Sequence, residues 1–137
     1  MSEVSTVEPD QRDSDIYVKV VWGLYVVSIL FGFTHIVGVI LAYIWRGGAP
    51  IGGLHRGHFD GQIRLFWRYL LLFLAVIFLF LVLSATSIFS ASGDAGFGIQ
   101  TGFITIIFIV FALAIHIYFD IMSIIGFIKA IGNRPYY

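Results

Sequence analysis

The sequence contains no cysteine, so disulfide bonds, thiolate catalysis and cysteine-ligated zinc or iron–sulfur centres are excluded. Charge is scarce as well, because only 12% of the 137 residues are Asp, Glu, Lys or Arg. Eight basic residues balance eight acidic ones, and no basic stretch is extended enough to predict a nucleic-acid partner. Because cysteine and charged residues are few or absent, the apolar residues indicate the class of protein.

Apolar residues make up 59% of the chain, and its mean hydropathy is +0.95. A soluble domain of this length has too little interior to bury them, whereas a bilayer accepts them directly. Three runs are apolar on every side, unlike transmembrane strands, which alternate. We therefore predict an all-α integral membrane protein with three transmembrane helices in one domain over 16–137, after a disordered acidic tail over 1–15. The predicted spans are about 16–46, 65–88 and 99–128.

The first apolar run is longer than one membrane crossing requires, and Gly32 lies in its middle. We predict one long tilted helix, with a helix broken near Gly32 or a tight hairpin there as the alternative. The arginine-rich loop over 46–64 and the C-terminus are expected to be cytoplasmic. Three crossings then place the N-terminus outside, whereas a hairpin at Gly32 keeps it inside.

The stretch "GHFDGQIRLFW", which opens the second span, alternates polar and apolar residues. With His55, it supplies the pattern H-x-x-H-x-D, so His55, His58 and Asp60 are weak candidates for a divalent metal site. The favoured interpretation is an interfacial turn in which His58 or Asp60 caps the helix. In that interpretation the basic residues keep this end inside and the tryptophan marks the interface, with Gln62, Arg64, Trp67 and Arg68 as the structural residues.

Ionisable residues inside the spans suggest a structural pair. Asp120 and Arg68 are at similar depths when counted from the cytoplasmic ends of their spans, and His116 is four residues before Asp120 on the same helix face. We predict an ion pair between Arg68 and Asp120, with His116 hydrogen-bonded nearby.

His35 and His116 are each about 15 Å deep in the membrane if the rise is 1.5 Å per residue. Two histidines at matched depth on different helices are able to ligate a b-type haem or to relay protons. Haem b held by His35 and His116 is therefore a candidate cofactor, although coincidence or hydrogen bonding to a neighbour explains the same pattern. No other cofactor is expected.

Three segments resemble a known family: "GVILAYIWRGGAP", "HFDGQIRLFW" and, loosely, the closing "NRPYY". The family comprises small bacterial membrane proteins of unknown function, described as similar to a chloroplast protein-import (Tic) channel subunit. It includes the magnetosome membrane proteins MamF and MmsF. The family pattern reads roughly G-V-I-x-A-Y-x-x-R and then S-H-[YF]-x-x-Q-I-R-T-F-W. The matching residues are Gly38, Val39, Ile40, Ala42, Tyr43, Arg46, His58, Phe59, Gln62, Ile63, Arg64, Phe66 and Trp67.

The sequence departs from this pattern where Gly57 replaces serine and Leu65 replaces threonine, and His35 and Asp120 are not part of it. The resemblance implies three or four membrane spans and, in the magnetosome relatives, a non-enzymatic role in crystal size or membrane organisation.

No nucleophile elbow, P-loop, metalloprotease helix or dinucleotide fingerprint occurs in the sequence. We therefore expect a non-enzymatic protein of the bacterial inner membrane, an accessory or scaffold subunit. Its partners would be the lipid bilayer and either copies of itself or a larger membrane complex. The alternatives are a channel- or translocon-like component and a haem- or quinone-associated respiratory anchor.

Overall fold

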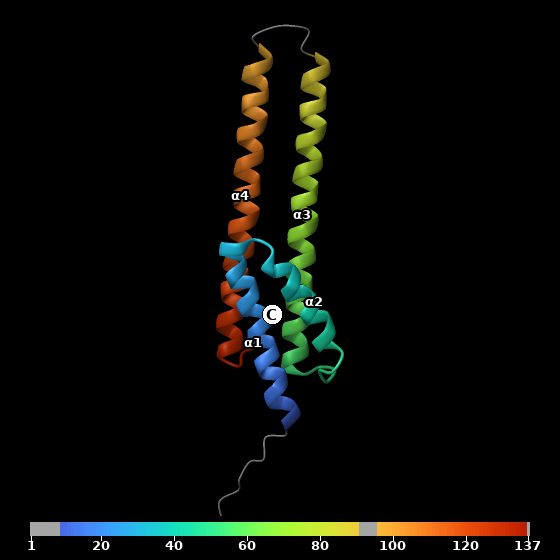
Figure 1. The fold of residues 1–137 in the computed structure, drawn as a ribbon, viewed down its shortest axis with the longest axis vertical. Helices are drawn as coiled ribbons and strands as arrows, with labels where there is room; N and C mark the ends of the chain where they lie inside the picture. Colours follow the sequence, from blue (N-terminus) through green and yellow to red (C-terminus); the bar gives the residue numbers. More distant parts are fainter. Residues whose placement is uncertain (1–8, 91–95, 137) are drawn as a thin grey trace, which may run out of the picture. The chain divides into compact units, whose positions relative to one another are not determined.

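The computed structural model describes residues 9–90 and 96–136, and in these ranges the chain forms four helices and no strand (Figure 1). They are α1 (Pro9–Phe31), α2 (Thr34–Arg46), α3 (Leu54–Ser90) and α4 (Gly96–Ile131). Three of the described helices contain stretches long and apolar enough to cross a membrane: Ser14–Phe31, Leu54–Thr86 and Ile99–Ile131. The predicted all-α membrane fold is confirmed at this level.

The single helix predicted over 16–46 is wrong, and the alternative of a break near Gly32 is right. The chain leaves α1 after Phe31 and enters α2 at Thr34. Gly32 has a φ of +54°, a left-handed conformation that glycine adopts without the steric cost other residues meet. Composition alone does not reveal this turn, because an apolar run has the same residues whether it is straight or turned. The positive φ of Gly32 ends α1.

Helix α2 folds back along α1. The Thr34 hydroxyl donates a hydrogen bond to the Leu24 carbonyl at 2.9 Å. A Cβ at Gly38 would lie 2.7 Å from the Tyr25 ring, so the absence of a side chain allows α2 to approach α1 closely. Gly38, Val39 and Ala42 form the buried face of α2.

Two predicted boundaries are also corrected. Helix α3 begins at Leu54 rather than near 65, so the connection after α2 is 47–53 and the rest of the predicted 46–64 loop is helical. At the N-terminus, residues 9–15 belong to α1 and not to the predicted disordered tail, whereas residues 1–8 are outside the described part of the chain.

The end of α4 is set by Asn133, whose φ is +48°. Its N–H donates to the Ala130 carbonyl at 3.3 Å, and the Arg134 N–H donates to the Lys129 carbonyl at 2.9 Å. These two bonds are the pattern of a Schellman turn, with Asn133 in the position that glycine usually occupies. The turn ends α4 and directs residues 134–136 away from the helix axis.

One domain is predicted over 16–137 from the sequence, and the structure divides the chain into two compact units. Unit 1 comprises residues 1–66 and 120–137, and unit 2 comprises residues 67–119. Unit 1 therefore contains α1, α2, the beginning of α3 and the end of α4.

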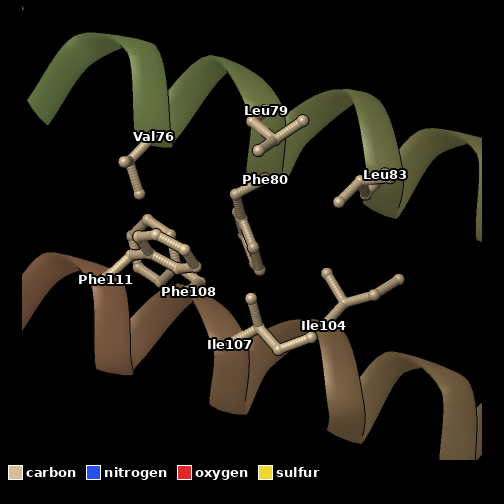
Figure 2. A pocket seen from close by; sticks show the side chains of 8 residues that line it. All are labelled: Val76, Leu79, Phe80, Leu83, Ile104, Ile107, Phe108 and Phe111. Carbon is tan, nitrogen blue, oxygen red and sulfur yellow. The ribbon is translucent and has the colours of Figure 1, made fainter. Parts of the chain in front are cut away.

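Unit 2 is a helix pair in which α3 and α4 meet through aromatic rings. The Phe80 and Phe108 ring centroids are 4.5 Å apart, and those of Tyr69 and Phe119 are 4.7 Å apart. Figure 2 shows Phe80 projecting from α3 towards α4. The helices enclose an apolar hollow there, with a volume of about 110 Å³. Its lining is entirely apolar: Val76, Leu79, Phe80, Leu83, Ile104, Ile107, Phe108 and Phe111.

Candidate functional site

The buried polar side chains of unit 1 gather where α1, the start of α3 and the C-terminal segment meet. Trp22, Tyr25 and Gln62 have no exposed surface, and His58 is 1% exposed. Together with Tyr136 they form what we call the Trp22–His58 cluster. Burying such polar groups is costly unless they are hydrogen-bonded, so their partners decide what the cluster does.

His58 joins α1 to the C-terminal segment through both of its ring nitrogens. The Trp22 indole N–H donates to Nδ1 of His58 at 3.1 Å. Since an indole nitrogen only donates, Nδ1 carries no proton and Nε2 does. The Nε2–H group therefore donates to the Arg134 carbonyl, 2.8 Å away. His58 is thus a neutral imidazole that accepts from one segment and donates to another.

Gln62 is one helical turn after His58 and faces α1 as well. The side-chain Nε2 of Gln62 donates to the Val18 main-chain carbonyl at 3.2 Å. The main-chain carbonyl of Gln62 accepts a hydrogen bond from the Tyr25 hydroxyl at 3.0 Å. Its Oε1 is buried and has no hydrogen-bond partner in the described part of the chain. The two helices are thus joined through side-chain and main-chain groups of both.

Two glycines, which have no side chain, allow the large rings of the cluster to pack directly against the helix backbone. A Cβ at Gly126 on α4 would collide with the Trp22 ring, and one at Gly61 on α3 would collide with the Tyr136 ring. The Trp22 and Tyr136 rings pack on each other with centroids 4.8 Å apart. The Tyr136 carbonyl accepts from Nζ of Lys129 at 2.7 Å, which holds the C-terminal segment against the end of α4.

The charged residues near this end of unit 1 pair with one another. Asp60 accepts from Arg46, which connects α3 to the end of α2. Both side chains are more than a third exposed, so the pair contributes little to stability. Asp15 binds Lys19 at 2.5 Å on α1, and His55 is 3.9 Å from the same carboxylate.

The three weak metal candidates are not brought together as a metal site. Both nitrogens of His58 are engaged, Asp60 pairs with Arg46, and His55 is directed to Asp15. In the described ranges no group of three histidine or acidic side chains is placed to hold a metal ion. The predicted cap is also wrong for His58, which is buried in the second turn of a helix that begins at Leu54.

The haem candidates belong to different units. His35 on α2 packs near Phe66, with ring centroids 5.8 Å apart, and His116 packs near Tyr69 at 6.4 Å. His116 also lines an open, mostly apolar groove of about 370 Å³ in unit 2, together with Tyr69 and Phe73. The haem site stays a prediction.

Arg68 and Asp120 also belong to different units, and their ion pair stays a prediction. The Arg68 side chain is exposed, as are those of Arg64 and Trp67, and the interfacial positions of these residues stay a prediction. Asp120 is partly buried.

Sequence reasoning missed the residues that complete the cluster, namely Trp22, Tyr25, Gly61, Gly126 and Tyr136. One signal was available: His58, Phe59, Gln62 and Leu65 recur at helical spacing, and all four are buried. The segment is therefore the core-facing stripe of a helix, with two polar residues in it.

No protein-family model, curated protein or solved structure matches this chain. The residues of the family-like pattern nevertheless have definite places in the structure. Gly38, Val39 and Ala42 face α1, and His58, Phe59 and Gln62 are buried in unit 1. In this chain these residues hold helices together.

Proposed function

We propose that this protein is a non-enzymatic integral membrane protein that acts as an accessory or scaffold subunit, associating with copies of itself or with a larger membrane complex. We place it in the bacterial inner membrane, in the MamF-like branch of the Tic-like family, with the connection after α2 and the C-terminus cytoplasmic. The placement rests on the arginines of the first connection and on the motif resemblance.

The observation that carries the proposal is the contrast between the inside and the outside of the molecule. Inside, His58, Trp22 and Gln62 are buried and bonded to one another or to main-chain groups, so they serve to join segments. Outside, α4 exposes a row of large apolar side chains, including Phe103, Ile106, Val110 and Leu113. Such surfaces face lipid or another transmembrane helix.

Gly102 offers a specific test of helix association. It is exposed on α4, and a Cβ there would meet nothing within 4 Å in the described part of the chain. With Gly98 it forms a small-xxx-small pattern, which lets helices approach closely in membranes. We expect Gly102→Leu to reduce the oligomeric fraction at least several-fold without destabilising the monomer, as measured by native mass spectrometry in mild detergent.

The matched control is Ala114→Leu, which adds a similar bulk at another exposed position of α4. Residue 114 is rotated by about 120° from residue 102 at 100° per residue, so it belongs to a different helix face. Equal losses in both variants would show a non-specific effect. A wild-type chain that is monomeric and co-purifies with no other membrane protein would contradict the proposal.

A second candidate is a haem- or quinone-associated membrane anchor, favoured by the groove that His116 lines. A Soret band in the purified protein that is lost in His116→Ala would support it. A channel-like component is the third candidate, and ion flux through reconstituted vesicles would identify it.

A further inference from the structure

In the hairpin formed by α1 and α2, the start of α1 lies beside the end of α2. The rings of Tyr17, near the start of α1, and Trp45, at the end of α2, are stacked with centroids 4.4 Å apart. Asp15 and His55 approach each other at 3.9 Å, so the start of α3 is also there. The chain therefore enters and leaves this hairpin at one end.

Polarity divides the hairpin sharply. Residues 20–45 contain no Asp, Glu, Lys or Arg, whereas Asp15, Lys19, Arg46 and Asp60 surround its open end. At the closed end the side chains are large, apolar and exposed: Leu30 by 80%, Phe33 by 65% and Phe31 by 58%. A water-facing turn normally carries polar residues, so this tip is suited to hydrocarbon.

The backbone at the tip is suited to hydrocarbon too, where unpaired polar groups are costly. The Gly32 N–H donates to the Ser28 carbonyl at 2.8 Å, and the Ile36 N–H donates to the Phe33 carbonyl at 3.0 Å. Hydroxyl groups also bond inward, since Ser28 donates to the Tyr25 carbonyl at 2.6 Å. The turn thus satisfies polar groups internally with short-range bonds.

The arms of the hairpin are shorter than a bilayer is thick. Helix α1 rises about 21 Å from Tyr17 to Phe31, and the 13 residues of α2 span about 20 Å. The hydrocarbon core of a bilayer is about 30 Å thick. A hairpin whose stacked Tyr17–Trp45 pair is at one interface therefore ends inside the membrane.

We propose that α1 and α2 form a re-entrant hairpin that inserts into one leaflet and returns, with the acyl chains of lipids covering Leu30, Phe31 and Phe33. The whole of α1, with 23 residues, is long enough to cross, but the part beyond Tyr17 is not, and only α3 and α4 then cross the membrane. The N-terminus is on the same side as the 47–53 connection, opposite to the position that three crossings require.

Because the chain has no cysteine, single cysteines report sidedness directly. We expect Ser14→Cys and Ile51→Cys to react with a membrane-impermeant maleimide from the same side in oriented membrane vesicles. Gln100→Cys, near the start of α4, should react from the opposite side. Reaction of Ser14→Cys from the side of Gln100→Cys would overturn the proposal.

The depth of the tip is tested with a nitroxide label on Leu30→Cys in vesicles of phosphatidylethanolamine and phosphatidylglycerol. We expect molecular oxygen to relax the label strongly and a water-soluble nickel chelate to have little effect, with the reverse for the 90%-exposed Ile51→Cys. Phe33→Cys repeats the measurement at a second tip position, in case one variant fails to fold.

Two outcomes at the tip would overturn the proposal. A label that reacts or relaxes from the side of Gln100→Cys would show a hairpin that crosses the whole bilayer. A label shielded from both oxygen and nickel would show that protein, for example a second copy of the chain, covers the tip.

Discussion

His58 shows how a histidine in a membrane protein becomes a structural connector. Its two nitrogens have opposite roles, since Nδ1 accepts from Trp22 and Nε2 donates to the Arg134 carbonyl. A protonated ring has two donors and would lose the Trp22 bond. At this position the imidazole therefore acts best in its neutral form, as a bridge between α1 and the C-terminal segment.

A double-mutant cycle measures this bridge. Trp22→Phe removes the indole donor and leaves Nδ1 of His58 buried without it, and His58→Leu leaves the indole N–H buried without its acceptor. Each unpaired group costs about 1–3 kcal/mol, so we expect the two effects to be less than additive by about 1 kcal/mol. The free energy of unfolding in detergent, from denaturant titration of each variant, gives the coupling.

Trp45→Phe combined with His58→Leu is the control pair. Trp45 stacks on Tyr17 and does not bond to His58 in the structure, so these two effects should add. Full additivity in the Trp22–His58 cycle would contradict the hydrogen bond.

At the scale of elements, residues with positive φ lie where the chain changes direction, and two of them, Gly32 and Asn133, are at helix ends. Gly32 separates α1 from α2, and Asn133 ends α4. The sequence marks the end of α4, because Pro135 follows Asn133 closely and forbids a continued helix. Around Gly32 no proline or polar cluster marks the turn, so the sequence favoured one long helix and left the break as the alternative.

Asn133 provides an element-scale prediction. A residue in the left-handed conformation costs about 1–2 kcal/mol unless it is glycine or, to a lesser degree, asparagine. We expect Asn133→Gly to keep or slightly raise the unfolding free energy and Asn133→Val to lower it by about that amount. The same detergent unfolding measurement compares them.

The same valine substitution at Arg134, just beyond the turn, is a suitable control. The Arg134 side chain is exposed, and the group that His58 contacts is the main-chain carbonyl, which valine retains. Arg134→Val should be close to neutral. Equal stability of the glycine and valine variants at position 133 would contradict the assigned turn.

For the whole molecule, the sequence predicted the helical membrane class because hydrophobic runs of this length have few other physical solutions. The pairing of the helices depends on residues that are far apart in the sequence and fit each other in shape, such as Trp22 against Gly126 and Tyr136 against Gly61. Single-sequence patterns do not contain that pairing. For the same reason His58 and Gln62 were recognised as distinctive residues but not as members of a core.

The C-terminal segment connects the end of the chain to α1, and its removal provides a whole-molecule prediction. Deleting residues 134–137 removes the carbonyl that accepts from His58 and the Tyr136 ring that covers Trp22. Losing a large, partly buried side chain such as Tyr136 costs up to about 2 kcal/mol, so unit 1 should loosen while the helices remain. In a variant with Trp22 as its only tryptophan, we expect a red-shifted emission and greater quenching by iodide.

A variant that retains only Trp67 provides the comparison, because Trp67 belongs to unit 2 and is already 46% exposed. Its emission should change less on the same deletion, since the contacts to His58 and Trp22 that are removed lie within unit 1. Equal shifts from Trp22 and Trp67 would mean that the deletion unfolds the whole protein. An unchanged Trp22 emission would mean that the C-terminal segment does not cover it. Only a change that is larger at Trp22 agrees with a chain whose last residues hold α1 in place.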